Sequence, residues 1–234
     1  GGPRHWELQY EHREEFADDL SFRADIKLVD DWNYYRDLEK TLELKSRPYL
    51  DSNAFYVERW NTASLYLLGQ YSTDLTGPST STVQKLPELR YDIFGESLGD
   101  HLYFRFEGRA SNFTADDGLS VLRADLNPEL AAVLSGSGLS FTPRAGARGT
   151  FYDRGATTYT PTERKYVYAA ADLNARFSRV YGADVDSGIG RIRHSIEPTV
   201  SYSYIPRIDQ GDIPHLDAVD QVQEENKVTA ALIN

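Results

Sequence analysis

Several residue types that often carry chemistry are missing from this chain of 234 residues. It has no cysteine, which excludes disulfides, thiolate metal sites and a cysteine nucleophile, and leaves the redox compartment open. It also has no methionine and begins Gly1-Gly2-Pro3, so we expect it to be a piece of a longer precursor. No run approaches the roughly 18 apolar residues that a membrane-spanning helix needs. Transmembrane helices are therefore excluded, but membrane-spanning strands, which are apolar only at every second position, are not.

Positive charge is scarce as well. The chain holds 25 Lys and Arg against 36 Asp and Glu, which gives a net charge of −11. Nucleic acid is therefore not expected as a partner, because its binding requires clustered cations. Aromatic residues, by contrast, are plentiful, with 16 Tyr and 3 Trp. They suit a sheet protein and also the aromatic girdles of a membrane β-barrel.

The clearest pattern runs from Gly190 to Pro206. Alternate residues from Ile192 to Tyr204 are mainly apolar, whereas those between them are charged or hydroxylated. Because side chains on a strand alternate between its two faces, this predicts one long strand of roughly 15 residues. That is much longer than the ~5–6 residues of an ordinary globular strand.

The same alternation recurs along the chain. It predicts further strands at 6–13, 20–28, 38–45, 49–60, 61–71, 89–94, 101–113, 119–126, 138–152, 165–180 and 227–233. The total is roughly twelve strands, most of them near the ~9–11 residues expected of membrane-spanning strands. Short turns alternate with long polar connections at 72–85, 153–164 and 206–226. No stretch has the apolar spacing of an amphipathic helix, so the predicted class is all-β.

Two architectures produce this alternation. One is a soluble β-sandwich with one solvated face, and the other is an antiparallel transmembrane β-barrel. The length of the strands, the uniform charge of the polar face and the unequal turns favour the barrel. We therefore expect residues 1–234 to be a single segment of a membrane β-barrel domain, covering only part of a larger barrel.

The polar faces of the predicted strands carry charges of both signs. The candidate lumen-facing charges are Arg23, Asp25, Lys27, Arg105, Glu107, Arg109, Arg191, Arg193 and Glu197. They could line a hydrated lumen that guides a charged amphiphile, or they could serve only to keep the inner surface of the barrel hydrated. The pattern alone does not choose between these interpretations.

No catalytic, metal-binding or cofactor-binding constellation emerges, and we expect no enzyme. The five His residues lie far apart and have no metal-ligand spacing. His194 and Ser195 are neighbours on a strand, so they face opposite sides and cannot pair. The stretch from Asp184 to Gly188 resembles a calcium loop faintly, but the Glu expected eleven residues after Asp184 is replaced by Ser195. A hairpin turn explains this stretch better.

The segment from Arg193 onward contains motifs that indicate which kind of membrane β-barrel this is. An Ile-Glu-Pro strand leads to a Tyr-x-Pro end, and a loop of the form Gln-x-x-Ile-Pro-x-Leu-Asp follows. The motif positions are Glu197, Pro198, Tyr204, Pro206, Gln210, Pro214 and Asp217. This series resembles the barrel of the LptD (OstA/Imp) family, the lipopolysaccharide-assembly proteins of the outer membrane.

Three other stretches resemble the same family more loosely. They are 29–34 (VDDWNY), 86–89 (LPEL) and 123–128 (RADLNP). Their order and spacing suit the middle of the family's barrel. The chain departs from the family pattern at Leu216, where many members have Phe, and at Asp30-Asp31, where Ser-Asp is usual.

The resemblance implies a translocon that inserts lipopolysaccharide into the outer leaflet of the Gram-negative outer membrane. Its partners would be lipopolysaccharide, outer-membrane lipids, a plug lipoprotein like LptE, and a periplasmic bridge that docks on an N-terminal jellyroll. That jellyroll, and the first and last barrel strands that form the lateral gate, are not expected within these residues. No cofactor and no covalent chemistry are implied. The alternatives are a general outer-membrane porin or receptor, and then a soluble β-sandwich binding module, with an outer-membrane lipase last.

Two local expectations follow from proline. Pro198 lacks an N–H, so it should lie at a bulge or a distorted position of the ladder. The loop 206–223 should be ordered, because its prolines restrict it and its Asp and Gln side chains can cap turns.

Overall fold

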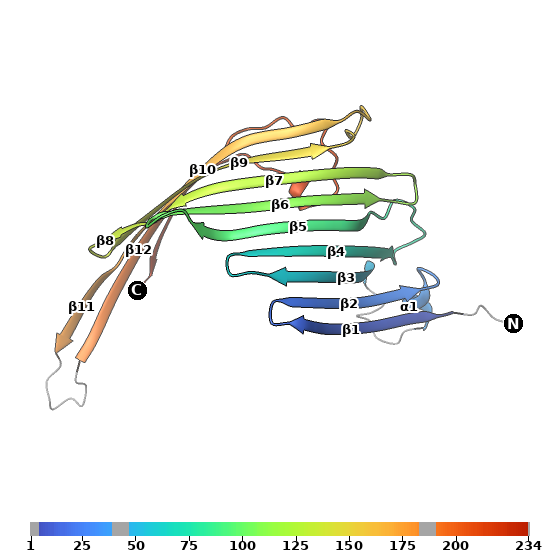
Figure 1. The fold of residues 1–234 in the computed structure, drawn as a ribbon, viewed down its shortest axis with the longest axis horizontal. Coiled ribbons are helices and arrows are strands. Elements are labelled where there is room, and N and C mark those ends of the chain that lie inside the picture. Colours follow the sequence, from blue (N-terminus) through green and yellow to red (C-terminus); the bar gives the residue numbers. More distant parts are fainter. Residues whose placement is uncertain (1–4, 39–46, 183–190, 234) are drawn as a thin grey trace.

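The computed structural model describes residues 5–38, 47–182 and 191–233. They form one antiparallel sheet of thirteen strands, which is not closed into a barrel (Figure 1). The strands are β1 (Glu7–Ala17), β2 (Leu20–Val29), β3 (Tyr49–Arg59), β4 (Ala63–Asp74), β5 (Gln84–Ser97), β6 (Leu102–Thr114), β7 (Ser120–Ala132), β8 (Leu134–Gly136), β9 (Leu139–Tyr152), β10 (Thr162–Ala175), β11 (Phe177–Gly182), β12 (Arg191–Ile205) and β13 (Glu225–Ile233). The all-β prediction of a partial barrel is confirmed. A β-sandwich would need a second sheet packed on the first, and the described residues form a single one.

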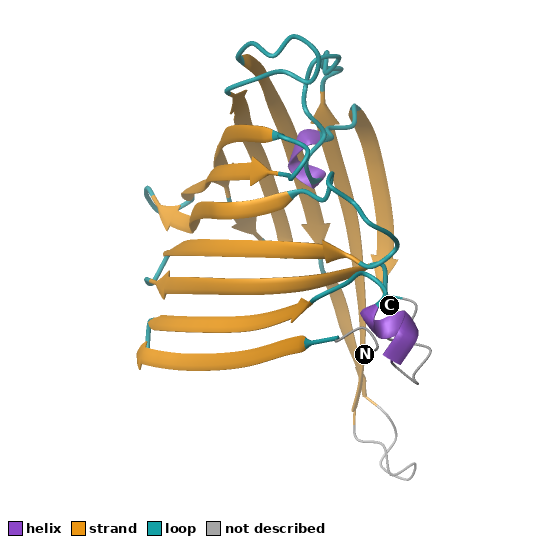
Figure 2. Ribbon diagram, turned by 90° about the vertical axis from the view of Figure 1, so that its right-hand side faces the viewer, coloured by secondary structure: helices purple, strands orange, loops and turns teal. Residues whose placement is uncertain are grey.

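Most neighbours in the sheet are also neighbours in sequence. The order runs from β1 to β7 and continues through β9, β10 and β12, and β13 pairs with the other side of β12. Among the described residues, the edge at β1 and the edge at β13 do not pair with each other. The sheet curves along this order, as Figure 2 shows, so it has an inner and an outer side.

The two ends of the strands differ in their connections. Tight turns join the strands at one end, and the β8–β9 hairpin turns through Ser137 and Gly138, whose φ angles are 52° and 80°. Two consecutive residues at positive φ form the hairpin turn that matches the twist of the flanking strands, and glycine adopts this conformation without steric cost. The long connections 75–83, 153–161 and 206–224 all lie at the opposite end. We call these the turn end and the loop end.

The two faces of the sheet have different chemistry. On β7, Val121, Arg123 and Asp125 are buried on the inner face, whereas Leu122 and Leu126, at alternate positions, are exposed on the outer face. The outer face also exposes Leu89, Leu130, Val167, Val200, Tyr202 and Tyr204. This is the two-sided alternation predicted from the sequence.

The predicted long strand at 190–205 is confirmed as β12, which has 15 residues. The single strand predicted over 165–180 is wrong, because the chain breaks at Arg176 into β10 and β11. The Arg176 amide still donates to the Gly138 carbonyl at 2.8 Å, one position beyond the last β9–β10 pair, but residues 175 and 176 do not pair with β12. Pro198 lies opposite this break, between the last β11 pair at Ile196 and the first β10 pair at Thr199, so its predicted distorted position is confirmed.

One predicted strand is replaced in part by a helix. Leu38, the first residue of the predicted strand at 38–45, ends the short helix α1 (Tyr34–Leu38). Tyr35 of α1 packs in a buried cluster with Leu50 and Leu75. The local pattern of apolar residues could not predict this contact, because its partners are distant in sequence. The rest of that predicted strand, and the predicted turn at 184–188, lie outside the described residues. In the part of the chain described, no helix is long and apolar enough to cross a membrane.

Candidate functional site

The connection between β12 and β13 folds back onto the inner face of the sheet. We call residues 206–224 the strap; Figure 2 shows it inside the curve of the sheet at the loop end. Ile213 of the strap packs in a buried cluster with Phe113 of β6, Val121 of β7 and Tyr152 of β9. The expectation of an ordered loop is confirmed, because the strap is held by a dense set of contacts.

The first anchor of the strap is Arg123 on β7, whose exposed fraction is only 2%. Its Nη1 and Nη2 donate to the two carboxylate oxygens of Asp217 at 2.6 and 3.0 Å, and Nη1 also donates to Asp220 at 2.9 Å. The guanidinium lies 4.7 Å from the ring centroid of Phe113. A planar guanidinium suits such bidentate pairing and ring stacking, so this one side chain binds both Asp217 and Asp220.

The second anchor is Arg164 on β10, which is equally buried. Its Nη1 donates to the Asp220 carbonyl at 2.7 Å and to Gln210 Oε1 at 3.0 Å, and its Nη2 donates to the Val219 carbonyl at 2.7 Å. Arg164 therefore satisfies strap backbone groups that would otherwise be buried without partners, which is costly.

The strap is also closed on itself. Residues 218–220 form the short helix η2 (Ala218–Asp220), which has a reciprocal capping box between Asp217 and Asp220. Asp220 Oδ2 accepts from the amides of Leu216 and Asp217, and Asp220 Oδ1 accepts from the Tyr152 hydroxyl at 2.6 Å. Gln210 exchanges two hydrogen bonds with the backbone of Val222, at 2.8 and 3.1 Å. Asp217 and Asp220 therefore each bind both the strap's own turn and the sheet.

The network extends to the strands on both sides of β7. Lys85 of β5 lies 3.1 Å from Asp217 and 3.4 Å from Glu88, which in turn accepts from Ser111. On the other side, Thr150 Oγ1 receives a bond from Arg164 and donates to Asp125 at 2.8 Å. Asp125 is fully buried and paired with Arg148 through three contacts of 2.8 to 3.2 Å. The five strands β5, β6, β7, β9 and β10 are thus tied to the strap by one polar network.

Charge compensation keeps the strap carboxylate ionised. Burial by itself would raise the pKa of Asp217, but the hydrogen bonds and positive charge of Arg123, with help from the Val219 amide and Lys85, outweigh it. The pKa of Asp217 is therefore held well below its ordinary value. The ionised form of Asp217 is the form that pairs with the positive charge of Arg123.

A second contact links the strap to the neighbouring loop 153–161. Asp212 accepts from the hydroxyls of Thr158 and Thr157 at 2.6 and 2.7 Å, and also from the Thr157 amide at 2.9 Å. These hydrogen bonds lower the pKa of Asp212 to about 2. The Asp212 carbonyl also accepts from the Ala156 amide at 3.0 Å, so the two loops are joined by backbone as well as side chain.

The family-motif positions have different surroundings. Gln210 and Asp217 belong to the network, Pro214 is buried in the strap, and Pro206 begins the strap. Tyr204 lies on the outer face, and Glu197 pairs with Arg176 at 2.7 Å beside the break in the ladder that accommodates Pro198.

The candidate lumen-facing charges are spread over three strands and are not gathered with the strap. Arg105, Glu107 and Arg109 alternate on the same face of β6 as Ser111 and Phe113, with an Arg109–Glu107 distance of 3.3 Å. Lys27 and Asp25 pair at 3.0 Å on β2, the strand that also carries Arg23. Arg191 and Arg193 are exposed near the start of β12.

Sequence reasoning did not assign Arg123, Arg164, Tyr152 and Asp220 to the site. Arg123 begins the 123–128 motif, and this local signal does not indicate which residue it binds. Asp220 lies 97 residues away from Arg123 in sequence, so no local spacing connects them. Within the described ranges, no group of three or more His, Cys, Asp or Glu side chains could hold a metal ion. The hydrogen bonds and ion pairs of the network hold the strap against the inner face of the sheet.

Comparison with known proteins shows which family the chain resembles in sequence. A family model described as LptD, "LPS transport system D", matches residues 3–232. The chain is similar to proteins named "LPS-assembly protein LptD". The one from Methylococcus capsulatus is 29% identical over 213 residues, covering 87% of this chain and 20% of the relative. The one from Vibrio cholerae is 25% identical over 215 residues, covering 89% and 27%. A third, from Azoarcus sp., is 26% identical over 239 residues, covering 94% and 29%.

The chain thus spans between a fifth and a third of the length of these relatives. Its match to the family model, however, covers nearly all of its own residues. The chain therefore belongs to the LptD family of lipopolysaccharide transport proteins.

Proposed function

We propose that this chain is a section of the wall of an outer-membrane β-barrel that inserts lipopolysaccharide into the outer leaflet of a Gram-negative bacterium. The observation that carries the proposal is a single curved sheet with an apolar outer face and a charged inner face. Family membership over residues 3–232 supports it. So do the names of the relatives, which are LPS-assembly proteins.

In this proposal the outer face contacts lipid and the inner face lines the lumen. Alternation of lipid-facing apolar and lumen-facing polar residues is typical of such barrels, as are short periplasmic turns and longer extracellular loops. The loop end would therefore face outward and the turn end would face the periplasm. The strap would then cover the lumenal wall near the cell surface.

The charged residues of the inner face would guide the cargo. Lipopolysaccharide is an amphiphile with a phosphorylated sugar headgroup, so its headgroup needs a hydrated, charged path. We assign that role to Arg23, Asp25, Lys27, Arg105, Glu107, Arg109, Arg191, Arg193 and Glu197 as a set. Asp217 and Asp220 of the strap, which are already paired with Arg123 and Lys85 of the sheet, would serve retention of the strap instead.

The partners are also part of the proposal. They are lipopolysaccharide, the surrounding outer-membrane lipids, a plug lipoprotein like LptE inside the lumen, and a periplasmic bridge reached through a jellyroll domain. The transport itself needs no covalent chemistry and no cofactor from this segment.

A photo-crosslinking amino acid in the full-length protein tests the proposal in cells. Glu107 and Phe106 are neighbours on β6 that face opposite sides, so they form a matched pair of positions. We expect position 107 to crosslink lipopolysaccharide only while the periplasmic supply is running, and position 106 to crosslink bilayer lipid regardless of that supply. Equal labelling of the two positions, or no supply-dependent adduct at position 107, would contradict the proposal and favour a general porin.

A further inference from the structure

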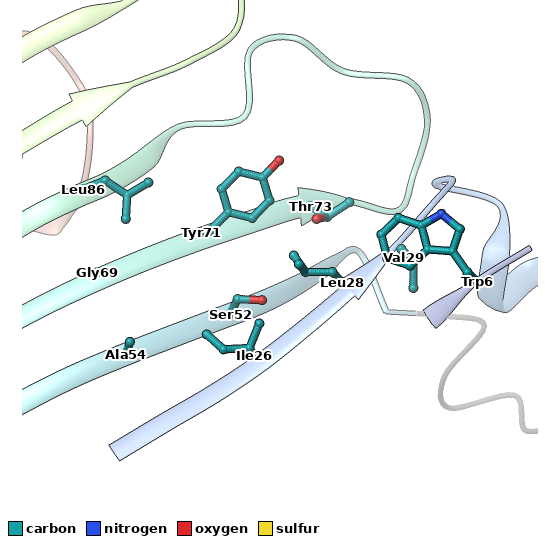
Figure 3. Close-up of a pocket in the computed structure, with 10 residues that line it drawn as sticks. All are labelled: Trp6, Ile26, Leu28, Val29, Ser52, Ala54, Gly69, Tyr71, Thr73 and Leu86. Carbon is teal, nitrogen blue, oxygen red and sulfur yellow. The ribbon is translucent and has the colours of Figure 1, made fainter. Parts of the chain in front are cut away.

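A groove opens on the outer face between β2 and β3 near the loop end. Figure 3 shows its lining, and its volume is about 580 Å³. Trp6, Ile26, Leu28, Ala54 and Leu86 supply apolar side chains, and none of the described residues that line it is charged. The volume falls within the roughly 300–1,000 Å³ typical of ligand pockets.

The groove exists because the ladder between β2 and β3 stops early. The two strands pair from Leu20 to Asp25, which is six residue pairs, whereas β3 and β4 pair over eleven. Beyond that point the Ser52 hydroxyl stands between the strands. It accepts from the Lys27 amide at 2.9 Å and donates to the Lys27 carbonyl at 2.8 Å. A side chain thus replaces direct backbone pairing, and the strands diverge.

This serine also makes the opening compatible with an apolar occupant. A broken ladder would normally expose backbone groups that a bilayer does not tolerate. Here the Lys27 amide and carbonyl are both satisfied by Ser52, which is itself only 4% exposed. Water in the groove would find few polar partners, and a buried water typically needs two to four of them.

The floor is built from small residues. Ala54 and Gly69 are paired across β3 and β4. A Cβ on Gly69 would approach Leu86 Cδ2 to 3.2 Å, so the glycine lets the Leu86 side chain lie close over β4. Larger side chains at these two positions would fill the groove from below.

We infer that this groove binds one hydrocarbon chain of a bilayer lipid, lodged where β2 and β3 diverge. The inference rests on the proposed function, since it takes the outer face to lie in the bilayer. The groove is continuous with that apolar face, which makes a lipid chain the occupant that fits it. Trp6 and Tyr71 also line the groove, and amphipathic rings of this kind are typical of the membrane–water interface.

The test uses full-length protein in lipid nanodiscs that contain a small fraction of phosphatidylcholine with a diazirine near the end of one acyl chain. After illumination, peptide mapping gives the labelling of Ile26 and Leu28 relative to Leu126, which lies exposed on the outer face away from the groove. We expect labelling at least fivefold higher in the groove. Ala54→Phe should reduce it to the level at Leu126, whereas Ala124→Phe, the same change on the outer face of β7, should not.

Even labelling of the groove and Leu126, or groove labelling that survives Ala54→Phe, would overturn the inference. Ala54→Leu is a milder filling variant, and the heat-dependent gel mobility of the barrel reports whether each variant has folded. If Leu126 itself remains unlabelled, the outer face is not in lipid and the proposed function fails. If only the groove enrichment is missing, this inference alone fails.

Discussion

The two ends of β12 lead into regions of opposite character. At its C-terminal end the strap returns to the sheet and buries Ile213, Val219 and Asp220. At its N-terminal end β12 pairs with β11 beyond the β8–β9 turn, and all six residues of β11 are exposed. Figure 1 shows this β11–β12 overhang extending away from the rest of the sheet.

The same residue type has different consequences in the two regions. Arg123 under the strap is almost fully buried and pairs with two carboxylates, whereas Arg179 on the overhang is exposed and lies 5.2 Å from the ring of Tyr181. Removing one partner of a buried ion pair leaves a buried charge without compensation, which is costly. An exposed charge remains hydrated, so the loss of its partner costs little. Burial of the guanidinium, and not the number of arginines, therefore decides how much stability is lost when an arginine is removed from each region.

The largest effect should come from Arg123→Ala. This change leaves Asp220 buried without its guanidinium, and breaking such a pair costs about 3–5 kcal/mol. We expect hydrogen–deuterium exchange across residues 206–224 of the full-length protein to rise to the level of an unprotected loop. Arg179→Ala is the matched control and should leave strap exchange unchanged. Unaltered strap protection in Arg123→Ala would refute the assignment of Arg123 as an anchor.

A smaller effect is expected from Tyr152→Phe. It deletes the hydroxyl that donates to Asp220 but keeps the ring in its cluster with Ile213 and Phe113. Loss of one such bond costs about 1–3 kcal/mol when a charged acceptor is left behind. Strap exchange should therefore increase measurably but less than in Arg123→Ala. An effect equal to that of Arg123→Ala would mean that the hydroxyl, and not the guanidinium, dominates retention.

The smallest effect concerns the link between the strap and loop 153–161. The pKa of Asp212 is about 2 in the folded chain, compared with about 3.9 for an unperturbed Asp. A lowered pKa means that the ionised form stabilises the link above about pH 4, and that this contribution is lost as the pH falls toward 2. A spin label on a cysteine introduced at Ala156 should therefore become more mobile between about pH 4 and pH 2.

Asp212→Asn provides the control for this titration. The amide cannot titrate and accepts fewer hydrogen bonds, so the label should be mobile at neutral pH and change little between pH 4 and pH 2. A pH-dependent rise of equal size in Asp212→Asn would show that other carboxylates cause it.

Many of the strands of the sheet could be predicted from the sequence, because the alternation of apolar and polar residues is a local pattern. An alternation such as that from Arg191 to Ser203 repeats every two residues, and the strand it predicts became β12 with almost the same bounds. The position of Pro198 followed from its missing N–H. The helix α1 and the break at Arg176 could not be predicted, since each depends on a distant segment, through the contact with Leu50 and the interrupted pairing with β12 respectively.

The strap was predictable only in part. Proline, Asp and Gln in residues 206–223 indicated an ordered loop, and Gln210 and Asp217 were among the motif positions. Their partners Arg123 and Arg164 lie on two different strands. Arg123 begins the 123–128 motif, but the sequence around neither arginine indicates which residue it binds. The role of each arginine emerges only when the strap covers it.

Alternation by itself determined the two-faced strands, the all-β class and the order of turns and loops, because strand geometry gives each residue a side from its position alone. The tertiary structure decided which charges are buried, where the β2–β3 ladder stops, and which end of β12 is covered. Those outcomes depend on contacts between residues as far apart as Arg123 and Asp220, and their energies depend on the water that the fold removes.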